Sequence, residues 1–271
     1  MDSTSIEAII NQELTIEREI ADKTPFVSAK IPIEELKNDY QTDDHIYRSK
    51  IEDIEKHYDH FRRTRPDGNC FFRAFGFAYF ESLLNENNKE ELDRFIKLAK
   101  TSKEELIQLG LPSVTVEDFS DIFLEVLLGI KDESIKSSEQ LLEKFCDQTT
   151  SDYIVVYFRL ITSCYLQQNA EKYANFIVGA SNIVDFCKAE VEPMYKESDH
   201  IHVVALTSAL QVKTRIIYMD RNLSKDGSVN AHDFPEQSDR LDGCRIHLLY
   251  KPGHYDVLYP GNVRQNTNTA L

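Results

Sequence analysis

One cysteine stands at the point where a polar turn passes into a predicted helix. The stretch TRPDGNCFFRAFGFA, residues 64–78, runs from an Asp-Gly-Asn turn directly into Cys70 and an aromatic run with helical spacing. At the start of a helix, unpaired backbone N–H groups and the helix dipole stabilise a thiolate. The same N–H groups can stabilise an oxyanion that forms beside the sulfur. Taken alone, the stretch fits an ordinary helix-start cysteine better than a nucleophile.

A histidine and an aspartate two residues apart lie near the other end of the chain. In YKPGHYDVLY, residues 250–259, His254 and Asp256 follow a predicted hairpin turn that contains Gly253. Side chains at positions i and i+2 of a strand point to the same face. The aspartate can therefore fix the tautomer of the histidine and support its charged form. On its own, such a pair also fits two solvent-facing residues of an edge strand.

Together, the two stretches predict nucleophilic catalysis by a thiol. A cysteine early on a helix, a histidine late on a sheet and a neighbouring carboxylate follow the order found in papain-like thiol hydrolases. We expect the Cys70 thiolate to attack a carbonyl, while His254 takes the thiol proton and later passes it to the leaving amine. Asp256 orients His254, and backbone amides near Asp67 and Cys70 hold the oxyanion.

These residues need a buried helix and a small sheet to support them. Helical periodicity dominates the first three quarters of the chain, and residues 70–84 predict a mostly buried helix. Short β-branched and aromatic runs at 214–220, 244–250 and 254–259 predict a small antiparallel sheet in the last quarter. The sequence therefore predicts an α+β protein. Five phenylalanines are expected to form the core behind the cysteine: Phe71, Phe72, Phe75, Phe77 and Phe80.

The ends of the chain differ in character from the predicted catalytic domain, residues 39–260. Residues 4–22 predict an amphipathic helix with a capping box at its start and an isoleucine-rich stripe. This helix either packs back on the domain or offers its stripe to a partner, and the sequence leaves both open. We therefore assign residues 1–38 to an arm made of a helix and a linker. Residues 261–271 have little to bury and predict a disordered tail.

The composition argues against several classes of function. A net charge of −15 and a pI near 5.0 argue against nucleic-acid binding, which needs a basic surface. No apolar run approaches the roughly 20 residues of a membrane span. The start of the chain shows no secretory signal pattern, so we expect a soluble protein of the cytoplasm, with the nucleus as a second location. Nothing in the sequence requires more than a monomer.

The remaining cysteines and histidines do not form a metal site of familiar spacing. The cysteines contain no CxxC pair, which argues against a zinc site, and we expect no cofactor. His200 and His202 lie two residues apart on a predicted helix and do not share a face, which favours structural roles. Away from Cys70, the thiols are expected to be free and buried. These are Cys146, Cys164, Cys187 and Cys244.

The motifs resemble those of one known family. RPDGNCFFRAFG resembles the catalytic-cysteine motif of the ovarian-tumour (OTU) family of deubiquitinating enzymes, and PGHYDVLY resembles the histidine motif of that family. Between them, TSDYIVVYFRLITSCYLQ, EVEPMYKESDHIHVVALTSAL and IIYMDR resemble the otubain branch. The similarity runs from residue 4 to residue 260, and the motifs occur in the same order.

The resemblance implies a papain-like cysteine protease (OTU) fold, mostly helical with a small central sheet. It implies hydrolysis of the isopeptide bond between ubiquitin and lysine, with Cys70, His254 and Asp256 as catalytic residues. Asp67 is implied as a motif position whose backbone amide joins the oxyanion hole. Ubiquitin and polyubiquitin are the implied substrates, with a preference for the linkage that marks proteins for the proteasome.

The resemblance also implies two kinds of partner. The helix at 4–22 is expected to contact the proximal ubiquitin, and ubiquitin-conjugating enzymes (E2) are expected to be bound and inhibited without use of the cysteine. Two alternatives stay open at this point. The chain could act mainly as an inhibitory module for ubiquitin and E2, or as a thiol hydrolase of another ubiquitin-like modifier.

Overall fold

The computed structural model describes residues 15, 19, 23–86, 88–177, 179–222, 224, 228–236 and 245–261. The predicted helix at 4–22 lies outside the described residues apart from Thr15 and Glu19, and the predicted tail lies outside them apart from Gly261. Among the described residues, no helix combines the length and the apolar character that crossing a membrane requires.

The elements follow the predicted order of helices before strands, with two exceptions near the start. The strands are β1 (Ile31–Pro32), β2 (Tyr58–Arg62), β3 (Thr214–Tyr218), β4 (Asn230–Phe234), β5 (Ile246–Lys251) and β6 (His254–Pro260). The α-helices are α2 (His45–Ile54), α3 (Cys70–Glu86), α4 (Lys89–Gln108), α5 (Ser113–Lys131), α6 (Ser138–Cys146), α7 (Gln148–Gln168), α8 (Ala170–Tyr173), α9 (Ile183–Phe186) and α10 (His200–Leu210). A 3₁₀ helix, η1 (Ile33–Asp39), and a π-helical turn, η2 (Cys187–Val191), complete the described elements.

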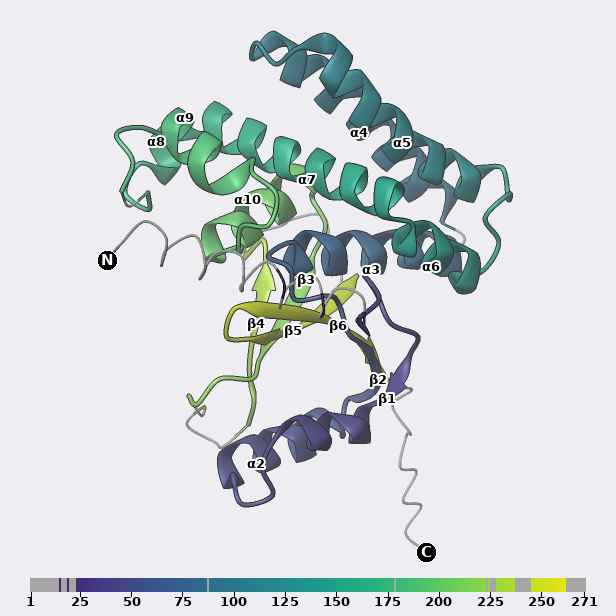
Figure 1. The fold of residues 1–271 in the computed structure, drawn as a ribbon, viewed down its shortest axis with the longest axis vertical. Coiled ribbons are helices and arrows are strands. Elements are labelled where there is room, and N and C mark those ends of the chain that lie inside the picture. Colours follow the sequence, from purple (N-terminus) through teal and green to yellow (C-terminus); the bar gives the residue numbers. More distant parts are fainter. Residues whose placement is uncertain are drawn as a thin grey trace, which may run out of the picture.

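The centre of the fold is a six-stranded sheet with the order β1-β2-β6-β5-β3-β4. The main body of helices covers one face of this sheet and α2 covers the other (Figure 1). Alternate residues of the central strands therefore enter different cores. Leu248 and Val257 pack with the main helices, whereas Leu249 and Leu258 pack on the side of α2. Because both faces are covered, the strands read as apolar runs rather than as alternating patterns.

The sheet differs in three respects from the antiparallel sheet predicted for the last quarter. β1 and β2 come from residues 31–62 and extend the sheet beyond β6. β4 is not among the predicted strands, and β3 pairs with β5 in parallel. The sequence of β2, YDHFR, is short and polar, so it carries little strand signal. The parallel pair arises because β4 returns antiparallel on the outer side of β3, which leaves the inner side for β5.

The helix α3 forms the middle of the main core. It is apolar on all sides, which is typical of a helix that other elements enclose. The five phenylalanines that the sequence assigned to the core are fully buried, so this prediction is confirmed. The Phe71 ring also packs against the Tyr255 ring of β6, with centroids 5.1 Å apart. Aromatic packing thus holds the start of α3 against the strand that carries His254 and Asp256.

Residues assigned from the sequence to the N-terminal arm pack into the domain. Val27 forms a β-bridge with Thr64 and belongs to the main core. β1 joins the sheet, and Ile33 and Leu36 of η1 are buried between α2 and the sheet. The stretch from Val27 to Leu36 is therefore packed into the body of the domain, and Val27 contacts Thr64, at the start of the stretch that carries Cys70.

The cysteines away from Cys70 divide into two groups. Cys164 and Cys187 are buried free thiols, as predicted. The prediction for Cys146 is wrong, because this thiol is exposed at the end of α6. The buried face of α6 is formed by Leu141 and Phe145, four residues apart, and the next position points away from it. Cys244 lies outside the described residues.

Candidate active site

Cys70 is the first residue of α3, as the turn-to-helix pattern predicts. Its side chain is 3% exposed, and its Sγ lies 4.0 Å from the carbonyl oxygen of Gly253. Gly253 belongs to the tight turn between β5 and β6, where its φ of +75° requires a residue without a side chain. The fold therefore brings the start of α3 to the hairpin that carries the predicted base.

His254 and Asp256 lie on one side of β6, as the two-residue spacing predicts. His254 Nε2 lies 3.0 Å from Asp256 Oδ1, and donation of the Nε2 proton to the carboxylate leaves Nδ1 as the free ring nitrogen. Nδ1 is buried and has no hydrogen-bond partner within the described part of the chain. This is the nitrogen that can exchange a proton with a thiol.

Asp256 is a fully buried carboxylate with three cationic or N–H neighbours. Oδ1 accepts hydrogen bonds from His254 and from the backbone N–H of Thr64 at 2.9 Å, and Lys251 Nζ lies 3.0 Å from Oδ2. Burial would raise the pKa of Asp256, but the bond from His254, the charge of Lys251 and the Thr64 amide hold it at about 2. Asp256 is therefore ionised at neutral pH and can stabilise a charged imidazole.

The imidazole of His254 is held in its charged form. Burial alone would lower the pKa of His254, but the hydrogen bond to Asp256 and the interaction with Cys70 raise it to about 9. At neutral pH the ring therefore carries a proton beside the sulfur. A neighbouring imidazolium favours the thiolate form of a cysteine, which is the form that attacks carbonyl carbons.

Asp67 occupies the turn before Cys70, and its carboxylate holds that turn in place. Its Oδ1 accepts from the backbone N–H of Asn69 at 2.9 Å, and its Oδ2 lies 2.7 Å from Arg73 Nη1. Arg73 is a fully buried residue of α3 that also bonds Ser151 on α7. The turn is thus tied to the interior by a buried guanidinium.

The backbone amide of Asp67 is engaged in the structure. It donates to the carbonyl oxygen of Arg65 at 3.0 Å, inside the turn itself. The resemblance assigns this amide to the oxyanion hole, and it reaches a substrate oxygen only after that bond opens. The role of Asp67 in holding an oxyanion therefore stays a prediction.

Sequence reasoning missed the groups that support the histidine and the cysteine turn. Lys251 and Thr64 lie inside the two quoted stretches. Lys251 contacts Asp256 across the β5–β6 hairpin, and Thr64 contacts it from a part of the chain that is 192 residues away in sequence. Arg73 lies three residues after Cys70 and reads from the sequence as an ordinary polar position of a helix. No local sequence pattern predicts that the Arg73 side chain is completely buried.

Gly68 offers a test of the turn that carries the cysteine. Its φ is +73°, and an added Cβ would lie 2.4 Å from the carbonyl oxygen of Tyr195. Replacing Gly68 by alanine must therefore displace the backbone next to Cys70, and we expect kcat/KM to fall by about 10²-fold. Gly110→Ala is the matched control, because Gly110 also has a positive φ but no atom near the new methyl group. Equal activity of the two variants would contradict a constrained turn.

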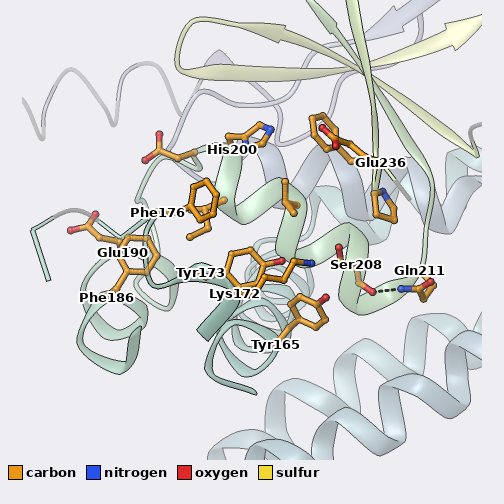
Figure 2. A pocket seen from close by; sticks show the side chains of 15 residues that line it. Tyr165, Lys172, Tyr173, Phe176, Phe186, Glu190, His200, Ser208, Gln211 and Glu236 are labelled. Atoms are coloured by element: carbon orange, nitrogen blue, oxygen red, sulfur yellow. Dashed lines mark hydrogen bonds between the residues drawn. The ribbon is translucent and has the colours of Figure 1, made fainter. Parts of the chain in front are cut away.

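A cavity in the helical layer is a separate feature of the described structure. It measures about 860 Å³ and lies between the end of α7, α8, α9, α10 and the end of β4 (Figure 2). Its aromatic lining includes Tyr173, Phe176 and Phe234, and Phe176 is 66% exposed. Cys70 and His254 do not line it. His200, at the start of α10, lines the cavity. The segment before α10 contacts the cysteine turn.

Comparison with known proteins assigns the chain to a family. The model of the family described as Peptidase C65 Otubain matches residues 19–260. Human ubiquitin thioesterase OTUB1 is 46% identical over 253 residues, which cover 93% of this chain and 90% of the relative. The OVARIAN TUMOR DOMAIN-containing deubiquitinating enzyme 1 of Arabidopsis thaliana is 40% identical over 264 residues, which cover 93% and 86%.

Solved structures agree with the sequence comparison. A complex of h/ceOTUB1 with ubiquitin aldehyde and UBC13~Ub superposes with a TM-score of 0.88 at 35% identity, covering 96% of this chain and all of the other. A related complex with UBCH5B~Ub gives a TM-score of 0.87 at the same identity and the same coverage of both chains. The papain-like OTU fold predicted from the motifs is therefore confirmed, and the chain belongs to the peptidase C65 otubain family.

Proposed function

We propose that this protein is a cysteine isopeptidase that cleaves the bond between ubiquitin and a lysine side chain. The observation that carries the proposal is the meeting of Cys70, at the start of α3, with the hydrogen-bonded pair of His254 and Asp256. The otubain relatives are named ubiquitin thioesterases, and the similar solved complexes contain ubiquitin aldehyde. Both point to ubiquitin as the acyl group that the thiol accepts.

The geometry supports a two-step acyl transfer. The Cys70 thiolate attacks the isopeptide carbonyl carbon, and the imidazolium of His254 gives its proton from Nδ1 to the leaving lysine amine. Ubiquitin is then bound to Cys70 as a thioester. Neutral His254 takes a proton from water, the resulting hydroxide attacks the thioester, and the thiolate leaves. Asp256 remains ionised throughout and stabilises the charged ring.

The aromatic cavity supports a protein substrate. A large side chain as exposed as Phe176, at the rim of a cavity lined by other aromatic residues, is typical of a surface that binds another protein. The segment from Val191 to Asp199 joins this surface to the cysteine turn. We infer that a ubiquitin bound at the cavity can direct its carboxyl end toward Cys70.

The test of the proposed function is a gel assay over all di-ubiquitin linkages. We expect the protein to cleave isopeptide-linked dimers and to prefer one linkage, the one that marks proteins for the proteasome. The preference rests on the resemblance, because the helix at 4–22, which is expected to contact the proximal ubiquitin, lies outside the described residues apart from Thr15 and Glu19. Failure to cleave any linkage would contradict the isopeptidase, and equal cleavage of all linkages would contradict the preference alone.

A second function is supported by the same comparisons. The similar solved complexes contain OTUB1 together with the E2 conjugates UBC13~Ub and UBCH5B~Ub. We propose that this chain likewise binds charged E2 enzymes and suppresses ubiquitin transfer without using Cys70. The Cys70→Ala protein separates this function from hydrolysis, because it should still inhibit ubiquitin transfer although it cannot cleave the isopeptide bond.

A further inference from the structure

A second buried arginine lies on the opposite side of the cysteine turn from Arg73. Arg159 belongs to α7 and is fully buried. Its Nη2 donates to the carbonyl oxygen of Gly68 at 2.9 Å, to Asn69 Oδ1 at 2.9 Å and to the carbonyl oxygen of Lys196 at 2.7 Å. Its Nη1 donates to the carbonyl oxygen of Val191 at 3.0 Å.

This arginine is unusual because none of its hydrogen-bond acceptors is a carboxylate. Within the described residues, no carboxylate lies at ion-pair distance from Arg159, whereas Arg73 contacts both Asp67 and Asp152. Burying a cation among neutral oxygen atoms is costly unless every donor is well placed. Burial lowers the pKa of Arg159 to about 10, so the side chain is still charged at neutral pH. A fold that retains such a group has a use for its position, its charge or both.

The position of Arg159 fixes the peptide groups directly before Cys70. The Gly68 carbonyl points to Arg159, and in a trans peptide the following N–H, that of Asn69, points the other way. That N–H donates to Asp67 Oδ1. The Asn69 side chain is shared between Arg159 and the backbone N–H of Tyr195 at 3.0 Å. The turn is therefore held between two buried guanidinium groups.

The same side chain joins the turn to two further parts of the site. The Arg159 guanidinium lies over the Phe72 ring of α3, 4.6 Å from its centroid. Through Val191 and Lys196 it also holds the segment that leads to α10 and the aromatic cavity. The charge of Arg159 acts on Asp67 and on Cys70, which both favour its protonated form.

We propose that Arg159 is a positioning residue of the reaction. It fixes the Gly68–Asn69 peptide, and with it the amides at the start of α3, and it adds a buried positive charge to the groups that surround the turn before Cys70. The inference rests on the proposed function for its kinetic consequence, but its electrostatic consequence is measurable on the protein without ubiquitin. Arg159 acts through these groups and does not itself touch the substrate.

The experiment compares Arg159→Lys with Arg159→Met. Lysine keeps the charge but cannot reach the four acceptors as a fork, so kcat for a ubiquitin amide substrate should fall about 10- to 100-fold with little change in KM. Methionine removes the charge as well. In that variant, alkylation of Cys70 by iodoacetamide at neutral pH, followed on the Cys70 peptide by mass spectrometry, should slow, because a positive charge beside the turn before Cys70 is lost. Arg159→Lys should keep the wild-type rate of alkylation.

Two controls separate positioning from simple destabilisation. Arg94→Lys is the control for loss of an arginine fork, because Arg94 also bonds a backbone carbonyl, that of Leu210, away from the cysteine turn, although it pairs with Glu91 as well. Asn69→Ala removes one acceptor of Arg159 and should lower kcat even if Arg159→Met does not fold. The proposal is overturned if the Arg159 variants lose no more kcat than Arg94→Lys, or if Cys70 in Arg159→Met is alkylated at the wild-type rate. Absence of cleavage by the wild-type protein would instead overturn the proposed function.

Discussion

Replacing Cys70 by alanine should abolish cleavage of di-ubiquitin, with a fall in rate of about 10⁴-fold or more. The change removes the only sulfur that the structure places at a helix start beside the His254–Asp256 pair, among the described residues. The fold should survive, because loss of one buried sulfur atom leaves a small cavity and costs about 1 to 2 kcal/mol. The measurements are a gel assay of cleavage and a thermal melt of the same samples.

The matched control is Cys146→Ala. Cys146 is a free thiol that is exposed at the end of α6, so its loss should leave cleavage unchanged. A ubiquitin probe with an electrophile at its carboxyl end should label the wild-type protein at Cys70 alone. Cleavage that persists in the Cys70→Ala protein, or labelling at another cysteine, would place the nucleophile elsewhere.

The Cys70→Ala protein also distinguishes hydrolysis from E2 inhibition. If the chain suppresses ubiquitin transfer by binding charged E2, the alanine variant should still inhibit chain synthesis in a reconstituted reaction. Deletion of residues 1–22 should remove this inhibition, because the resemblance assigns the helix at 4–22 to the contacts with ubiquitin. If the alanine variant does not inhibit, the non-catalytic function is wrong for this protein.

The second large effect is expected for Asp256→Asn, which should lower kcat by about 10²- to 10⁴-fold. The substitution keeps the shape of a buried side chain but removes the charge that supports the imidazolium of His254. In the wild type, the Thr64 amide and the Lys251 ammonium each face a carboxylate oxygen of Asp256. Asparagine presents its amide N–H₂ group to one of these two donors instead. The pKa of His254 should fall from about 9, because the hydrogen bond to the Asp256 carboxylate no longer opposes the effect of burial.

The pH dependence of stability gives this prediction a second measurement. The pKa of His254 in the folded protein is above its ordinary value of 6.5, so the charged ring stabilises the fold. This stabilisation is fully present below about pH 6.5 and is lost as the pH rises through 9. The free energy of unfolding of the wild type should therefore decline between these values. The Asp256→Asn protein should show a smaller decline over the same interval.

Glu81→Gln is the matched control for loss of a buried carboxylate. Glu81 lies on α3 and pairs with Arg62 at 3.1 Å, away from His254. Its substitution should destabilise the fold while the pKa of His254, measured by NMR titration, stays near 9. If Asp256→Asn lowers kcat no more than Glu81→Gln, Asp256 has only a structural role.

The residues that carry the chemistry could be predicted because their signals are local. A turn followed by helical spacing is legible within a few residues, and it correctly placed Cys70 at the first position of α3. The alternation of side chains along a strand is equally local, and it put His254 and Asp256 on one side of β6. The buried phenylalanines of α3 follow from a helix that is apolar on every face.

What surrounds these residues was decided by contacts between distant parts of the chain. β2 is short and polar, so the sequence does not predict it as a strand. It forms a strand because it pairs with β6. Cys146 is exposed although it directly follows the buried Phe145, because the direction of a side chain depends on which face of α6 meets the core.

The supports of the cysteine turn show the same division most clearly. Arg159 bonds backbone carbonyls of Gly68, Val191 and Lys196. Every residue has a backbone carbonyl, so the sequence does not indicate which ones will accept a hydrogen bond. Likewise, the Asp67 amide bonds Arg65 inside its own turn, which no motif indicates. The sequence by itself determined which groups are predicted to react, since that prediction depends on side-chain type and local spacing. Only the tertiary structure decided how they are held and charged, since that depends on burial and on backbone groups brought together by the fold.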